Sequence, residues 1–137
     1  PLTNPAGAKK YLLGVFDPAF IERMAEALVE LDTSRAFVVS SDDGMDEISL
    51  ATTTQFAYVE SGRVSMGVID PQEFGFKKAP KEAILGGLAT DNALITKNIF
   101  SNLATDAQRD IVILNAGHAL FADGKARDMK EAFEIAR

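Results

Sequence analysis

Residues 10–40 constrain the fold most, because they alternate two apolar runs with one helical stretch. Residues 10–16 (KYLLGVF) form the first run and predict a strand. Asp17-Pro18 follows and is typical of a helix N-cap with proline at the first helical position. Five apolar residues then recur at helical spacing and predict a buried face: Ile21, Met24, Ala25, Leu28 and Leu31. A second strand over residues 35–40 completes a strand–helix–strand unit, which pairs its strands in parallel.

The middle of the chain changes to a hairpin pattern. Residues 55–60 (QFAYVE) and 63–69 (RVSMGVI) flank Ser61-Gly62, and a two-residue connection with glycine predicts an antiparallel hairpin.

Helices are predicted in the last third. Thr90 or Asp91 caps a helix that runs to about Leu103. Within residues 107–122, the central residues 111–114 (IVIL) fit a strand by composition. The residues that follow this centre, 115–121, and the terminator Gly124 favour one long buried helix over the whole segment. A last helix is expected to begin near Ala126.

Together these elements predict an α/β fold: a partial, mostly parallel β-sheet flanked by helices, with an antiparallel hairpin. Residues 1–137 are expected to form a single domain, since this length supports one ordinary core. A helical stripe that runs into Arg137, and a first residue that is not an initiator, lead us to expect a piece of a larger α/β domain.

Composition excludes several classes of protein. The apolar fraction of 47% is too high for a disordered chain, and no apolar run approaches the length of a membrane span. A net charge of -6 argues against a dedicated nucleic-acid binder, which needs clustered lysine and arginine. The absence of cysteine excludes disulfides and thiolate metal sites and is compatible with a cytoplasmic location.

Residues 42–47 (DDGMDE) are the main candidate for chemistry, because they place four carboxylates directly after the second predicted strand. Ligands of open α/β sheets bind beyond the carboxyl ends of the strands, and Mg²⁺ prefers oxygen ligands. Asp46 and Glu47 are therefore candidate Mg²⁺ ligands. The alternative is a helix start with Asp43 as its cap, since acidic residues are favoured there. Asp42 and Asp43 themselves are expected to be solvated turn residues or caps.

Other features have simpler structural interpretations. His118, the only histidine, is expected to be a core or helix-end residue with a local hydrogen bond rather than a general base. Residues 52–54 (TTT) are expected to lead into a strand. Residues 1–7 (PLTNPAG) are expected to form a turn-rich connector, and the alternative is that they line a substrate pocket. Gly86-Gly87 lacks the spacing of a nucleotide-binding fingerprint.

A series of motifs in order carries a family resemblance. These motifs are residues 2–6 (LTNPA), 13–18 (LGVFDP), 44–49 (GMDEIS), 70–75 (DPQEFG), Gly86-Gly87 with Asn92-Ala93, and 114–116 (LNA). Together they resemble the carboxyl-terminal portion of the anthranilate phosphoribosyltransferase family, whose catalytic domain has a nucleoside-phosphorylase-like fold.

The resemblance implies transfer of a phosphoribosyl group from phosphoribosyl pyrophosphate to anthranilate, with Mg²⁺ as cofactor, in a cytoplasmic homodimer that binds neither nucleic acid nor membrane. Asp46 and Glu47 match the metal-binding pair of the family, and no catalytic or substrate-binding residue is carried over. The helical domain and the glycine-rich pyrophosphate loop precede the matched region, so we expect the chain to be inactive alone.

This sequence departs from the family at residues 40–42 (SSD), where relatives often have His-Gly, and at His118, where small residues are common. A nucleoside phosphorylase and a nucleic-acid-binding paralogue of the same fold stay open as alternatives. An exposed sheet edge is also expected to make the isolated chain self-associate.

Overall fold

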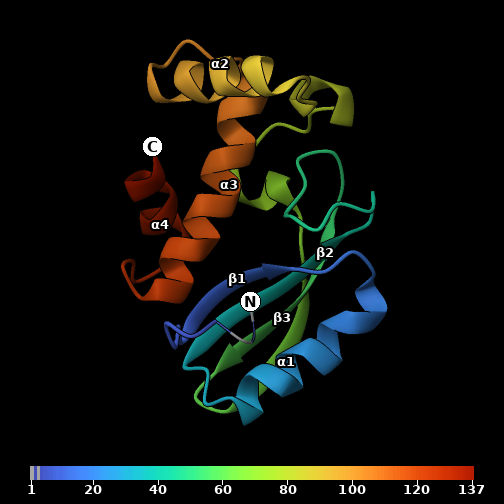
Figure 1. The fold of residues 1–137 in the computed structure, drawn as a ribbon, viewed down its shortest axis with the longest axis vertical. Coiled ribbons are helices and arrows are strands. Elements are labelled where there is room, and N and C mark those ends of the chain that lie inside the picture. Colours follow the sequence, from blue (N-terminus) through green and yellow to red (C-terminus); the bar gives the residue numbers. More distant parts are fainter. Residues whose placement is uncertain (1, 3) are drawn as a thin grey trace.

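The structure is a computed structural model that describes residue 2 and residues 4–137 (Figure 1). Pro1 and Thr3, which belong to the first sequence motifs, lie outside the described residues. The strands and helices follow in this order: β1 (Lys10–Gly14), α1 (Ile21–Glu30), β2 (Arg35–Ser41), β3 (Thr54–Glu60), β4 (Arg63–Ile69), α2 (Ala89–Phe100), α3 (Asp106–Asp123) and α4 (Met129–Ala136). Short 3₁₀ turns cover Pro18–Phe20, Pro71–Phe74 and Lys81–Ile84.

The predicted strand–helix–strand unit is confirmed. The Asp17 side chain accepts a hydrogen bond from the Ala19 amide at 2.8 Å, and Pro18 opens a 3₁₀ turn before α1 begins. A tight turn of this kind is common at helix N-termini. Helix α1 buries Ile21, Ala25 and Leu28 on one face, as predicted. Leu31 is the exception, because it lies at the C-cap, where Asp32 adopts a positive φ and ends the helix.

The sheet has the strand order β1-β2-β3-β4. Strands β1 and β2 pair in parallel, whereas β2–β3 and β3–β4 are antiparallel. The α/β class and the antiparallel hairpin are therefore confirmed, but the described sheet contains less parallel pairing than expected. The reason is that residues 42–53 form no crossover helix between β2 and β3, so the chain returns beside β2 in the opposite direction. At the hairpin turn, Ser61 and Gly62 both adopt a positive φ, which matches the right-handed twist of the strands.

Strand β2 separates two apolar cores. Ala36 and Val38 face α1 and belong to the core that contains Ile21, Ala25 and Leu28. The alternate residues, Phe37 and Val39, belong to a second core built with α3 and α4. Helix α1 therefore covers one face of the sheet and α3 the other, while α2 lies beyond the far end of α3 (Figure 1).

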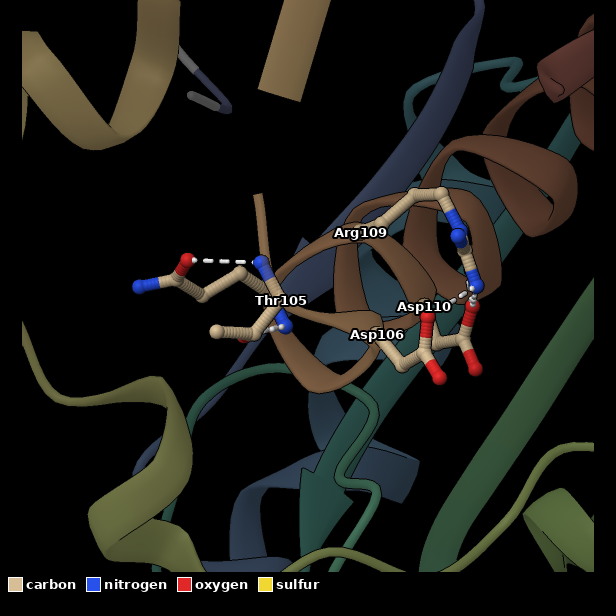
Figure 2. A network of polar contacts seen from close by, with 5 residues as sticks. Thr105, Asp106, Arg109 and Asp110 are labelled. Atoms are coloured by element: carbon tan, nitrogen blue, oxygen red, sulfur yellow. Dashed lines mark hydrogen bonds and ion pairs between the residues drawn. The ribbon is translucent and has the colours of Figure 1, made fainter. Parts of the chain in front are cut away.

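Residues 111–114, whose composition also fits a strand, lie inside the 18-residue helix α3. The predicted long helix is therefore confirmed. Its first turn is fixed by a capping box in which Thr105 and Gln108 exchange backbone and side-chain hydrogen bonds. Figure 2 shows Arg109 close to Asp106 and Asp110. Arg109 Nη2 forms ion pairs with Asp106 Oδ1 at 3.1 Å and with Asp110 Oδ1 at 3.0 Å. At the other end, Gly124 takes the left-handed conformation that terminates many helices.

The other helices differ only at their ends from the prediction. Helix α2 begins at Ala89, and Asp91 accepts from the Leu88 amide at 3.0 Å, so Asp91 caps the helix from inside its first turn. Helix α4 begins at Met129 rather than near Ala126, because Asp128 caps it. No helix of the described residues has both the length and the apolar character that crossing a membrane requires.

Candidate metal centre

Asp46 and Glu47 lie in the loop of residues 42–53, which leaves the carboxyl end of β2 and enters β3. This loop contains turns and bends but no helix, so the alternative that the acidic pair starts a helix is wrong. Both side chains are exposed, whereas the next residues, 48–50, are buried. The chain therefore turns inward immediately after the two carboxylates and leaves them at the rim of the sheet.

The backbone of Asp46 rests against the end of β1. A β-carbon placed on Gly14 would lie 1.6 Å from the Asp46 carbonyl oxygen and 2.5 Å from its carbonyl carbon. No side chain can occupy that space, so only glycine allows the loop to lie this close to the strand. This contact places Asp46 beyond the carboxyl ends of both β1 and β2, which is where open α/β sheets bind ligands.

The backbone of Ile48 is held from the other direction by α3. The Ile48 amide donates to Asn115 Oδ1 at 2.9 Å, and Asn115 Nδ2 donates to the Ile48 carbonyl at 2.9 Å. Asn115 Nδ2 also donates to the carbonyl of Ile111, at 3.0 Å. Glu47 is thus followed directly by a residue whose backbone polar groups are both bound by one side chain.

Asp43 organises the first half of the loop. It accepts hydrogen bonds from the hydroxyl of Ser41, from the hydroxyl of Ser49 at 2.8 Å, and from the amide of Met45 at 3.3 Å. Partial burial acts to raise the pKa of Asp43, but these hydrogen bonds outweigh it and hold that pKa below its ordinary value. Asp43 is therefore a turn residue, as expected, but it is half-buried and structural rather than solvated.

Asp42 is exposed, as expected, and has one hydrogen-bond partner at the end of the loop and one on β3. It accepts from the hydroxyl of Thr53 and from Gln55 Nε2 at 3.0 Å, and these bonds lower its pKa. The hydroxyl of Thr54 is buried and accepts from the Ser49 amide at 3.1 Å. The threonine run thus leads into β3, as expected, and its hydroxyls form hydrogen bonds within the acidic loop.

The charges of the acidic pair are not balanced by a described basic side chain, because none forms an ion pair with Asp46 or Glu47. Desolvation, and then the neighbouring charge of Asp46, raise the pKa of Glu47 above its ordinary value. A bound cation would relieve this repulsion, so the donor set fits a hard, oxygen-preferring ion such as Mg²⁺.

Two carboxylates do not complete a coordination shell. The described residues contain no group of three or more histidine, cysteine, aspartate or glutamate side chains suited to holding a metal. Mg²⁺ commonly keeps waters and substrate phosphate oxygens beside one or two carboxylates, and the pair leaves room for both. Glu47 also lines an open pocket of about 370 Å³ whose wall is mostly apolar: Met45, Ile111, Val112, Asn115 and Ala116.

The remaining candidates lie elsewhere and have structural roles. His118 is buried in α3, and its Nδ1 lies 2.8 Å from the carbonyl of Leu114, so the predicted core histidine with a local hydrogen bond is confirmed. The Gly87 amide donates to Asn92 Oδ1 at 2.8 Å, at the start of α2. In residues 1–7, Asn4 accepts from the amides of Ala6 and Gly7, which confirms a turn there.

The sequence analysis assigned no role to Gly14 or Asn115, which hold the backbone around the acidic pair, although both lie in motifs that carry the family resemblance. A signal existed for Asn115, since it is the single amide within the apolar stretch of residues 111–116. Gly14 lies in the motif of residues 13–18, but its role could not be derived from that motif, because its contact is with a loop that is distant in the sequence.

Comparisons with known proteins identify the family of the chain. The model of the family described as "Glycosyl transferase family, a/b domain" matches residues 1–137. The chain is 46% identical to the anthranilate phosphoribosyltransferase of Pelotomaculum thermopropionicum, over 99% of this chain and 39% of that protein. Its fold matches the crystal structure of the Thermus thermophilus enzyme with a TM-score of 0.87 and 39% identity, over 99% of this chain and 40% of that one.

A more distant match shows the fold alone. The anthranilate phosphoribosyltransferase of Saccharomyces cerevisiae, in complex with PRPP and Mg, is 18% identical with a TM-score of 0.79, over 93% of this chain and 37% of that one. The chain thus spans about two fifths of the length of the relatives it matches. The predicted resemblance to anthranilate phosphoribosyltransferase is confirmed, and the chain belongs to the glycosyl transferase family as part of its α/β domain.

Proposed function

We propose that this chain is part of an anthranilate phosphoribosyltransferase of tryptophan biosynthesis, in which Asp46 and Glu47 bind Mg²⁺. The observation that carries the proposal is the exposed, uncompensated carboxylate pair, which Gly14 and Asn115 fix at the carboxyl ends of β1 and β2. The names of the relatives supply the substrates, phosphoribosyl pyrophosphate and anthranilate. A homodimer in the cytoplasm stays a prediction from the resemblance.

The reaction replaces pyrophosphate with the amine of anthranilate at the anomeric carbon of the ribose. The carbon–oxygen bond to pyrophosphate breaks, a carbon–nitrogen bond forms, and the amine loses a proton. Mg²⁺, when bound, would supply neutralisation of the negative charge on the departing pyrophosphate. Asp46 and Glu47 would contribute oxygen ligands, and their fixed backbone would keep those ligands in place while the charge develops.

The test uses the complete polypeptide with the substitutions D46N and E47Q, which remove charge and conserve shape. Loss of metal-dependent charge stabilisation, worth several kcal/mol, predicts a decrease in kcat/KM of about a hundredfold or more. The matched control is E26Q, which neutralises an exposed carboxylate of α1 outside the loop and should leave kcat/KM unchanged. Unchanged catalysis in both loop variants would refute the metal site. Phosphorolysis of a nucleoside, in place of phosphoribosyl transfer to anthranilate, would refute the substrate assignment.

A further inference from the structure

Asn115 contributes three hydrogen bonds from one side chain, and two of them bind the residue next to Glu47. Its Oδ1 accepts from the Ile48 amide, and its Nδ2 donates to the carbonyls of Ile48 and Ile111. The amide group is therefore fully oriented, because its carbonyl and both of its N–H bonds have partners. The bond to Ile111 lies within α3, so the helix contributes to the orientation of the amide together with the loop.

Ile48 connects Asn115 to the acidic pair, because it directly follows Glu47 in the chain. Its side chain is 0% exposed and packs in the core between the sheet and α3. Its backbone amide and carbonyl have no place in a strand ladder, and an unpaired backbone group at a buried position is costly. The Asn115 amide fills both needs. The residue after Glu47 is thus fixed by its side chain and by both backbone polar groups.

Gly14 constrains the first member of the pair, Asp46. Its close contact with the Asp46 carbonyl prevents the loop from moving toward β1. The dipeptide Asp46-Glu47 is consequently held between β1 and α3. Glu47 and Asn115 also line the same open pocket, so a change at Asn115 acts close to the Glu47 side chain.

We infer that Asn115 is a positioning residue for the metal-binding pair, a conclusion that rests on the proposed function. It holds the main chain at Ile48 so that the carboxylates of Asp46 and Glu47 lie at a fixed separation and direction. Without it, the pair would have to be ordered when the metal binds, and the cost of that ordering would lower metal affinity.

The experiment compares N115A and N115D with the unmodified complete polypeptide. N115A removes all three hydrogen bonds. N115D keeps the acceptor for the Ile48 amide but places carboxylate oxygen against the carbonyls of Ile48 and Ile111. The matched control is N92A, because Asn92 makes a similar two-way amide contact with the Gly87 backbone at the start of α2, outside the acidic loop.

Two measurements are needed. The first is binding of Mn²⁺, as a paramagnetic substitute for Mg²⁺, followed by the electron paramagnetic resonance signal of the free ion in the presence of phosphoribosyl pyrophosphate. The second is the Mg²⁺ concentration that gives half-maximal activity. Loss of a residue that orients metal ligands typically reduces metal affinity about 10- to 100-fold, so we expect both midpoints to rise by at least about tenfold in N115A and N115D. N92A should leave both midpoints unchanged.

The outcomes separate the two proposals. A merely structural role for Asn115 would lower the active fraction, and hence the maximal rate, while both metal midpoints stayed in place; that result would overturn the inference. If D46N and E47Q also bind Mn²⁺ normally and remain fully active, the proposed metal site itself fails, whatever Asn115 does.

Discussion

Gly14 and Asp46 are in direct backbone contact, and the absence of a side chain at Gly14 allows the acidic loop to lie against β1. The alanine substitution G14A would place a β-carbon 1.6 Å from the Asp46 carbonyl oxygen. One of the two segments must therefore move. Overpacking of this kind costs roughly 1–3 kcal/mol, and we expect that decrease in the free energy of unfolding, measured by urea denaturation.

The control for this prediction is G44A, in the same loop. A β-carbon on Gly44 would meet no atom within 4 Å, but Gly44 has a φ of +82°, so its substitution introduces backbone strain without a collision. Strain of this kind costs roughly 1–2 kcal/mol. In the complete polypeptide, G14A should also raise the Mg²⁺ midpoint, because it displaces Asp46. Normal stability together with an unchanged midpoint in G14A would show that the contact is not needed.

Asp43 is expected to stabilise the loop through its hydrogen bonds to Ser41, Ser49 and Met45. The substitution D43A removes these charge-assisted bonds and should lower the free energy of unfolding by about 2 kcal/mol at pH 7. D42A is the matched control, since Asp42 is exposed, and it should cost less. Equal losses in the two variants would contradict this role.

The pH dependence of the D43A effect follows from the lowered pKa of Asp43. A carboxyl whose pKa is lower in the folded state stabilises the fold at pH values above its ordinary pKa of 3.8. That contribution is lost as the pH falls through the folded-state value. The difference between D43A and the unmodified chain should therefore shrink below pH 3.8, which urea denaturation at pH 7 and pH 3 can measure. A difference that stays constant would mean that the charged form is not the one that is stabilised.

His118 makes the stability of the fold depend on pH in a different window. It is 2% exposed and lies against the rings of Phe37, Phe74 and Phe133. Burial lowers the pKa of His118 to about 4 from its ordinary value of 6.5, although the hydrogen bond to Leu114 opposes this shift. The folded state therefore keeps the imidazole neutral, whereas the unfolded chain takes up a proton below pH 6.5.

Stability should consequently be fully present above pH 6.5 and fall as the pH decreases toward 4. Over that range the loss from His118 amounts to about 3 kcal/mol, since one pKa unit corresponds to about 1.4 kcal/mol. The comparison is between the unmodified chain and H118F, because both chains contain the same carboxyl groups that change protonation in this pH range. The free energy of unfolding of H118F should decrease less between pH 7 and pH 4.5. Parallel curves for the two chains would exclude His118 as the source.

The elements that the sequence predicted correctly are those set by local chemistry. Asp17-Pro18 and Ser61-Gly62 each determine a cap or a turn through their own backbone preferences, and Gly124 ends α3 in the same way. The location of Asp46 and Glu47 near the carboxyl end of β2 was also predictable, because the acidic segment of residues 42–47 follows a buried strand. The residues that hold them were not. Ile48 and Asn115 are 67 positions apart, and only the packing of α3 on the sheet brings them together.

The direction of pairing was harder to predict for a similar reason. The hairpin of β3 and β4 was evident from Ser61-Gly62, but its pairing with β2 depends on the path of residues 42–53. That path is determined by buried contacts of Ile48 and Leu50 with α3 and the sheet, which no periodicity in the loop indicates. Tertiary packing therefore decided how many of the strand pairs are parallel.

Strand β4 is the element through which the isolated chain is expected to self-associate. It lies at the end of the strand order, so its outer backbone groups have no partner strand among the described residues. Val64, Met66 and Val68 are 37%, 57% and 59% exposed and share one face of the strand. An exposed, apolar edge strand without proline or an inward-pointing charge is a template for pairing with a second chain.

Sedimentation velocity over a range of concentrations measures this association, and we expect dimers or larger species of the isolated chain to increase with concentration. The substitution M66K places a charge in the middle of the edge and should shift the distribution toward monomer, because pairing would bury the added charge. L94K is the control, since it puts the same charge on an exposed apolar residue of α2, outside the sheet. Monomers at every concentration would contradict the prediction, and an equal effect of L94K would indicate that general hydrophobicity, not the β4 edge, drives the association.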